Sequence, residues 1–177
     1  MTRSKMPISL IALFALTTGC AMNVKLPMTG DEMRQMSQKP TETYEVNKSY
    51  KDVSETVAKK AEQCLNISIK TTTHMSNGAK TISYLHYKPT VKKQNGVLTL
   101  ELQQSHEGGN RIQLGQPKMP EGGMYIVLAD VKAAGKSTAV DLYYGKLGFI
   151  NPYENIVNAV KGWADGSIRG CPDLANG

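Results

Sequence analysis

The chain has 177 residues and a formal net charge of +6, and 20% of its residues are charged. Beyond a leader segment, this length suits one domain with a single core. Lysines are dispersed from Lys25 to Lys161 without a dense basic run, and the few aromatic residues are mostly tyrosines, which argues against a nucleic-acid-binding protein. The excess of positive charge fits either contact with an anionic surface or lysines scattered over a solvent-exposed surface.

The first 20 residues have the pattern of a secretory signal peptide. Arg3 and Lys5 precede an apolar run at residues 8–16, and small residues follow it. The run is too short to cross a hydrocarbon core of about 30 Å, which takes roughly 20 helical residues. The chain is therefore predicted to be exported, with residues 1–19 removed.

Gly19 and Cys20 close this run and resemble the lipobox of bacterial lipoproteins, with Thr17 where that pattern usually has leucine. The resemblance implies that Cys20 becomes an acylated N-terminus, and multiple acyl chains anchor a protein stably in the lipid bilayer. Ala21 after the cysteine implies delivery to the outer membrane, on its periplasmic face. The alternative is an ordinary signal peptide cut after Ala21, which would leave a soluble periplasmic protein.

The cysteine count agrees with an exported lipoprotein. Lipidation of Cys20 leaves Cys64 and Cys171, an even pair in an oxidising compartment, so a disulfide between them is predicted. A bridge that closes a loop of about 100 residues contributes about 4–5 kcal/mol in the chain-entropy model. Two buried free thiols are the alternative.

Residues 20–40, which follow the signal peptide, are predicted to be a flexible tether. Four methionines lie there among prolines, glycine and polar residues, without a helical or strand period. The alternative is an adaptable methionine contact that becomes ordered on a partner. One α+β periplasmic domain is then expected over residues 41–177.

The first half of that domain alternates strands with one helix. Residues 41–47 alternate polar and apolar side chains, as a strand does. Ser49 and Asp52 indicate a helix start, and apolar residues recur at three- and four-residue spacing through Leu65, with Cys64 on that face. Further strands, several separated by turn sequences, are predicted at residues 67–73, 81–87, 97–102, 124–131 and 138–144.

The second half contains a loop and a second helix. Residues 105–123 are rich in glycine and proline and are predicted to form a long exposed loop, with at most a short strand at 111–114. Asn151 and Pro152 fit the N-cap and first position of a helix that carries Trp163 and ends near Gly166.

These elements predict an α+β fold, a two-layer sandwich in which an antiparallel sheet of about five to six strands packs against two helices on one face. The order of elements resembles the helix-grip domains of accessory lipoproteins of the outer-membrane β-barrel assembly machinery. The resemblance concerns the fold, and it implies a structural or interaction accessory of an envelope assembly, with an envelope protein as partner. Residues 105–123 and an exposed sheet edge are the candidate contact surfaces.

Signatures of catalysis and metal binding are missing from the sequence. The Gly-Lys-Ser sequence at 135–137 lacks the upstream glycine of a phosphate-binding loop, because Asp130 occupies that position. His74, His86 and His106 are separated without the spacing of metal ligands. We therefore expect a protein that is not an enzyme and that uses no metal or cofactor.

A second class of function is a binding module for a lipid or other small apolar ligand between helices and sheet. Such a module would have a sizeable cavity lined by residues such as Trp163 and Tyr144. The competing interpretation is that Trp163 and Tyr153 anchor the second helix to the sheet by core packing.

Overall fold

The computed structural model describes residues 26–74, 76, 78–108, 119–145 and 153–174. The predicted signal peptide and Cys20 lie outside these residues. The short strand expected at 111–114 and the helix start expected at residues 151 and 152 lie outside them as well.

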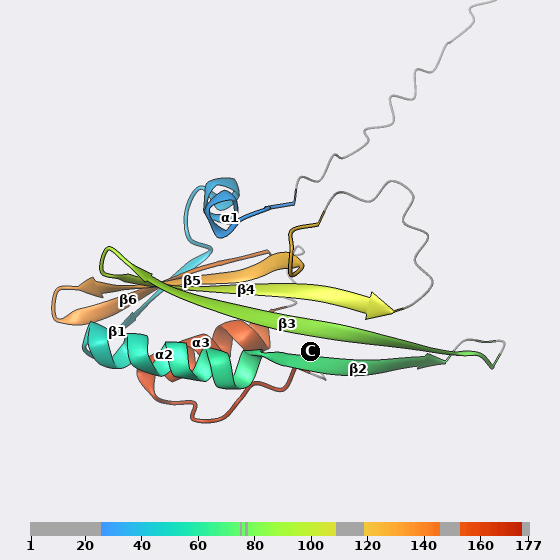
Figure 1. The fold of residues 1–177 in the computed structure, drawn as a ribbon. Helices are drawn as coiled ribbons and strands as arrows, with labels where there is room; N and C mark the ends of the chain where they lie inside the picture. The colour runs from blue at the N-terminus through green and yellow to red at the C-terminus, as the bar shows by residue number, and fades with distance from the viewer. Residues whose placement is uncertain (1–25, 75, 77, 109–118, 146–152, 175–177) are drawn as a thin grey trace, which may run out of the picture.

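A six-stranded antiparallel sheet forms the centre of the domain, in the order β1-β6-β5-β4-β3-β2 (Figure 1). Five strands follow one another along the chain as neighbours, and β1 pairs with β6 at the opposite edge from β2. The sheet is curled rather than flat. The strands are β1 (Glu42–Val46), β2 (Ile67–His74), β3 (Lys80–Gln94), β4 (Val97–Gly108), β5 (Met124–Ala134) and β6 (Ser137–Tyr144).

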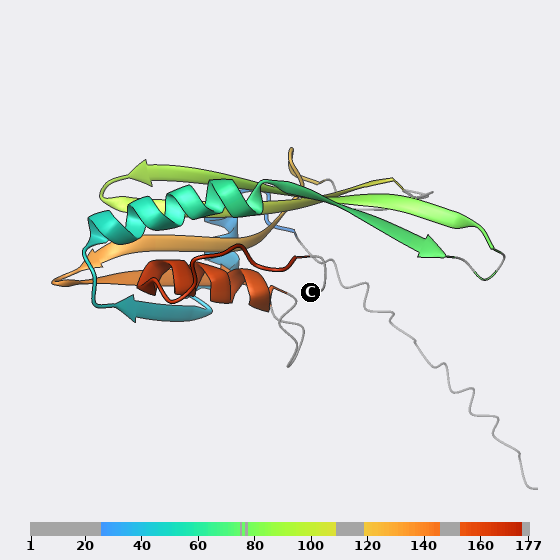
Figure 2. The same cartoon turned by 90° about the horizontal axis from the view of Figure 1, so that it is seen from below.

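Helices cover both faces of the sheet. Helices α2 (Tyr50–Leu65) and α3 (Glu154–Asp165) lie side by side on one face, called the inner face below, and α1 (Gly30–Ser37) lies on the outer face (Figures 1 and 2). The predicted α+β fold with an antiparallel sheet and two helices on one face is thus confirmed in its broad outline. The third helix was not predicted, and it corrects the expectation of a flexible tether at residues 30–37.

Helix α2 forms where the sequence predicts it. The Ser49 side chain accepts a hydrogen bond from the Asp52 backbone N–H at 3.2 Å, which satisfies one of the free donors at the helix start. The apolar stripe faces the sheet and is buried, as expected for an amphipathic helix. The stripe comprises Val53, Val57, Ala61, Cys64 and Leu65.

The core fills the space between α2, α3 and the inner face of the sheet. Alternate residues of the central strands supply its sheet side, as the two-residue period of a strand requires. These residues include Leu98, Leu100, Leu102, Val127, Ala129, Val131, Val140 and Leu142. From α3, Trp163 is 1% exposed and packs in the same cluster.

Two strands are longer than predicted, and one helix begins elsewhere. Strand β4 runs to Gly108 rather than ending at residue 102, so the start of the predicted 105–123 loop is strand. Strand β3 continues to Gln94, directly before the turn that leads into β4. Helix α3 begins at Glu154 with Tyr153 at the N-cap, where no side chain caps the helix.

The β2–β3 hairpin projects beyond the two inner helices, as both views show (Figures 1 and 2). We call this hairpin the arm and define it as β2 together with residues 80–87 of β3, which pair with β2 from Ile67↔Tyr87 to His74↔Lys80. Helix α2 leads into β2 across Asn66 alone, so the arm starts where the helix layer ends.

Candidate functional site

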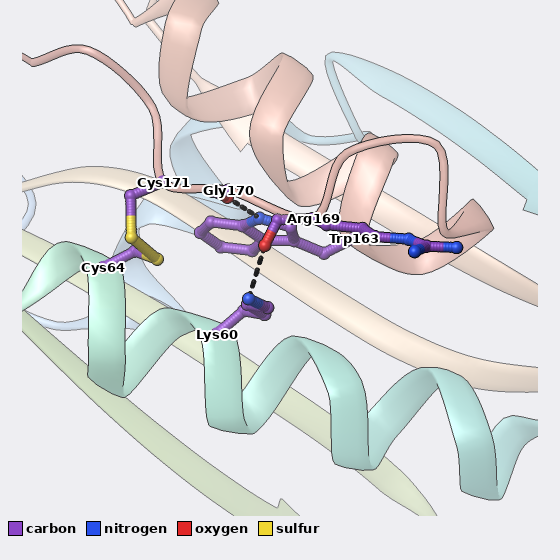
Figure 3. Close-up of a disulfide and its surroundings, with 6 residues drawn as sticks. All are labelled: Lys60, Cys64, Trp163, Arg169, Gly170 and Cys171. Carbon is purple, nitrogen blue, oxygen red and sulfur yellow. Dashed lines mark hydrogen bonds between the residues drawn. A yellow bond between two sulfur atoms is a disulfide. The ribbon is translucent and has the colours of Figure 1, made fainter.

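A disulfide fixes the C-terminal tail against the helices (Figure 3). Cys64 at the end of α2 is bonded to Cys171, 107 residues later, and this is the pair that the sequence predicts. The Trp163 indole N–H donates to the Gly170 carbonyl at 2.9 Å. The Lys60 ammonium donates to the Arg169 carbonyl at 2.5 Å. The tail therefore follows a defined path from α3 towards the base of the arm.

That path makes the tail one wall of a cavity of about 430 Å³. The cavity lies between the inner face at the base of the arm and the first turn of α3. Strands β2, β3 and β4 line one side, and α3 and the tail line the other. The lining residues are Ile69, Thr71, Leu85, Tyr87, Gln104, Tyr153, Asn155, Ile156, Asp173 and Leu174.

The cavity wall combines apolar side chains with a few oriented polar groups. The Gln104 side-chain amide donates to the Tyr87 hydroxyl at 3.1 Å, and the Asn155 side chain donates to the Asp173 carbonyl at 3.1 Å. Burial raises the pKa of Tyr87 and of Tyr153, so both phenols stay neutral at physiological pH. The wall thus combines polar and apolar surface, and its one charged residue in the described part of the chain is Asp173, so it suits an uncharged group better than an anion.

The second feature of this region is the edge of the sheet. Strand β2 is the last strand of the order, and none of the described residues pairs with its free side. All of its residues except Ile69 are exposed. The backbone N–H and C=O groups along this side are therefore available to another strand.

The edge and the cavity share residues. Ile69 and Thr71 lie on the edge strand and also line the cavity. Lys70 between them faces the outer side, because neighbouring side chains of a strand point to opposite faces. The mouth of the cavity is thus next to a strand that lacks a partner on one side.

The arm itself carries two lysines, Lys70 and Lys80, and no aspartate or glutamate. The continuation of β3 to Gln94 adds three more lysines, of which Lys92 forms an ion pair with Glu101 at 2.8 Å. Two large apolar side chains on the outer face of the arm are also exposed, Ile82 at 45% and Tyr84 at 38%. Charge and exposed apolar surface therefore occur together on one projecting element.

A polar chain crosses the outer face of the arm. The Ser68 hydroxyl lies 2.6 Å from His86 Nδ1, and His86 Nε2 lies 3.1 Å from a Glu107 carboxylate oxygen. The order hydroxyl, imidazole, carboxylate is also that of hydrolytic triads. These side chains, however, lie on an open sheet and line neither of the cavities described here, so nothing seats a substrate against Ser68. We interpret the chain as a cross-strand contact that ties β2, β3 and β4 together.

On the outer face, α1 is held by a partly buried ion pair. The Arg34 guanidinium donates to both Asp130 carboxylate oxygens, at 2.8 and 2.7 Å, and to the Thr99 hydroxyl at 3.1 Å. The hydrogen bond with Asp130 raises the pKa of Arg34. Met33 is buried under the helix. A smaller cavity of about 190 Å³ lies beside α1 and includes Tyr144 in its wall.

The other predicted residues are placed as follows. Trp163 lies in the packed core and lines neither cavity, in agreement with the core-packing interpretation and not with the cavity that the alternative binding module requires. His74, His86 and His106 do not gather, and the described part of the chain has no group of three or more potential metal ligands. Residues 135 and 136 form the turn between β5 and β6. No helix among the described residues is long and apolar enough to cross a membrane.

We compared the chain with known proteins. No protein-family model, no curated protein and no solved structure matches this chain.

Proposed function

We propose that this protein is a lipoprotein, anchored through acylated Cys20 on the periplasmic face of the outer membrane, that acts as an interaction accessory of an envelope assembly. The anchor is inferred from the signal-peptide pattern and the Gly19-Cys20 pair. In this proposal the protein binds another envelope protein and has no catalytic role or cofactor of its own.

The observation that carries the interaction role is the projecting arm. Pairing of β3 with β4 ends at Ser83, so beyond that point the hairpin has no third strand among the described residues. A two-stranded hairpin is marginally stable in water, because it buries little apolar surface. The arm nevertheless extends past the helices and exposes Ile82 and Tyr84. A partner that covers these side chains would supply the burial that the rest of the domain does not.

Co-purification from native membranes tests this proposal. Tagged full-length protein would be recovered from detergent-solubilised membranes, alongside a Cys20→Ala variant that cannot be acylated. A second variant, Ile82→Ser with Tyr84→Ser, removes the apolar surface of the arm, and Met36→Ser on α1 is its control, since Met36 is also an exposed apolar residue. We expect one stoichiometric partner that is lost with Cys20→Ala and with the arm variant and is kept with Met36→Ser. Recovery of the wild type without a partner would overturn the proposal.

A second candidate function is a binding module for a lipid or small apolar ligand, and the 430 Å³ cavity favours it. Ligand sites are commonly about 300–1,000 Å³ and mostly apolar. Leu85→Trp would fill the cavity from the sheet side. Native mass spectrometry of protein isolated from membranes should then show a small-molecule adduct on the wild type and none on Leu85→Trp. A wild type without an adduct would exclude this candidate.

A further inference from the structure

We propose that the free edge of β2 and the cavity beside it form one peptide-binding site, which takes an extended acidic segment of the partner as a seventh strand. The inference rests on the proposed interaction function and specifies the chemistry of the partner. An added strand obtains its affinity from backbone hydrogen bonds and its specificity from pockets for alternate side chains. Both requirements are met at β2.

The register of an added strand directs its side chains into the cavity. Residues directly opposite each other on paired strands have Cβ atoms about 4.5–5.5 Å apart and point to the same face. Side chains opposite Ile69 and Thr71 would therefore face the inner side, where both residues line the cavity. Because one residue separates these positions on the partner as well, an extended segment can present two alternate side chains to the same space.

The wall of the cavity selects apolar side chains at those two positions. Ile69, Leu85 and Ile156 contribute aliphatic groups, and the Tyr87 hydroxyl is already bonded to Gln104. An acidic side chain placed there would lose its hydration without a cation among the described residues of the wall, whose one charged residue is Asp173. Leucine, isoleucine or valine at alternate positions is the pattern that fits.

The outer side of the same edge selects acidic side chains. Lys70 lies between Ile69 and Thr71, faces the outer side and is exposed. Opposite charges on paired strands are favourable, whereas like charges directly opposite each other are destabilising. The arm carries Lys70 and Lys80 and no acidic residue, so its net charge favours a negative segment. The same charge disfavours a second copy of this chain, since pairing β2 with β2 would bring two basic arms together.

Binding of a designed peptide tests the site directly. The probe is a fluorescein-labelled Thr-Glu-Leu-Glu-Leu-Glu-Thr peptide, which alternates leucine and glutamate, and its partner probe has lysine in place of each glutamate. Fluorescence anisotropy with the full mature chain in detergent should show saturable binding of the glutamate probe and at least tenfold weaker binding of the lysine probe. No saturable binding of the glutamate probe would overturn the inference.

Backbone methylation distinguishes strand addition from simple charge attraction. A strand uses only every second N–H towards a given neighbour, and the others point away. Two probes methylated on alternate sets of amide nitrogens should therefore differ, one losing at least tenfold in affinity and the other binding as before. Equal affinities of the two methylated probes would overturn the pairing.

Charge reversal on the edge completes the test. Lys70→Glu should weaken the glutamate probe at least tenfold and strengthen the lysine probe. Lys136→Glu, at another exposed lysine in the β5–β6 turn, should change neither. Equal effects of the two variants would overturn the assignment to the β2 edge.

If the glutamate probe fails while co-purification still yields an arm-dependent partner, the peptide site is wrong and the interaction function stands. If the probe binds as expected and no partner is ever recovered, the interaction function is wrong and the site stands.

Discussion

Gly162 in the middle of α3 has a local packing role. Alanine is normally the better helix residue by about 1 kcal/mol. Here, however, a Cβ at this position would lie 2.4–2.6 Å from side-chain atoms of Ile168, where the chain turns back after the helix. The Ile168 N–H donates to the Gly162 carbonyl at 3.0 Å, which fixes that approach. The glycine is therefore required by the close contact and not by its backbone conformation.

We expect Gly162→Ala to lower the free energy of unfolding by about 1–3 kcal/mol, because overpacking forces neighbouring groups to move. Chemical denaturation measures the change. Gly170→Ala is the matched control, since a Cβ there would meet nothing within 4 Å, and it should stay within about 0.5 kcal/mol of the wild type. A Gly162→Ala variant as stable as the wild type would show that Ile168 does not pack as described.

The hydrogen bond from the Tyr44 hydroxyl to the Asp165 carboxylate predicts a pH dependence. Hydrogen bonds from Ser167 and Tyr44 lower the pKa of Asp165, and the bond to Asp165 raises the pKa of Tyr44. The contribution of Asp165 is present above its unfolded pKa of about 3.9 and is lost as the pH falls through the lower folded value. The contribution of Tyr44 is present below about pH 10 and is lost as the pH rises through the higher folded value.

Tyr44→Phe should therefore be less stable than the wild type between about pH 4 and pH 10, with a difference that shrinks outside this window. Urea denaturation of both proteins at acidic, neutral and strongly alkaline pH provides the comparison. A difference that is constant across the whole range would contradict this assignment.

The contacts that could be predicted from the sequence are those that do not depend on which residues lie opposite each other in the sheet. The pairing of Cys64 with Cys171 follows from counting thiols in a chain with a predicted signal peptide. The contact of Ser68 with His86 and Glu107 depends on the register of three strands, and neighbouring sequence does not determine which residues lie opposite each other. Composition indicates the first kind of contact and is silent on the second.

Among the elements, α1 shows why a short helix cannot be predicted from apolar periodicity. It has eight residues, and Met33 is its one buried apolar side chain, so no repeated apolar stripe exists. Its local signals are the Thr29 side chain, which accepts from the Glu32 N–H at 3.1 Å, and acidic residues in the first turn. Helix α2, with four turns and a complete apolar face, could be predicted because its pattern repeats.

Arg34→Ala should release α1 from the sheet. It would leave the Asp130 carboxylate, whose side chain is 12% exposed, without its cation, and removing one member of a buried pair costs about 3–5 kcal/mol at most. Hydrogen exchange should show faster exchange across residues 30–37. Arg34→Lys should protect α1 partly, because lysine keeps the charge but cannot form the two parallel hydrogen bonds. Unchanged exchange in Arg34→Ala would mean that Met33 alone holds the helix.

At the scale of the whole molecule, the disulfide joins the two ends of the domain. Replacing both Cys64 and Cys171 by serine removes a constraint on a loop of 107 residues and should lower the free energy of unfolding by about 4–5 kcal/mol in the chain-entropy model. Denaturation of the double variant and of reduced wild type should give matching values. A loss below about 1 kcal/mol would show that the rest of the fold already holds the tail in place.

The class of fold could be predicted from the sequence, and its shape could not. Alternating segments separated by turns indicate an antiparallel sheet, and two amphipathic stripes indicate helices that pack on it. The length of the arm and the curl of the sheet depend on how far β3 and β4 remain paired beyond the core, which turn residues alone do not determine. The cavity beside β2 is a consequence of that shape, and so the sequence did not indicate its position.

The packing of α1 on the sheet also determines how many residues separate Cys20 from the folded domain. If Cys20 carries the proposed anchor, ten residues, 20–29, precede the helix. At about 3.3–3.6 Å per residue, this segment spans at most about 35 Å, whereas the whole of residues 20–40 would span about twice that distance. With that anchor, the contact between Arg34 and Asp130 would limit the distance between the membrane and the sheet, and its release would roughly double this limit.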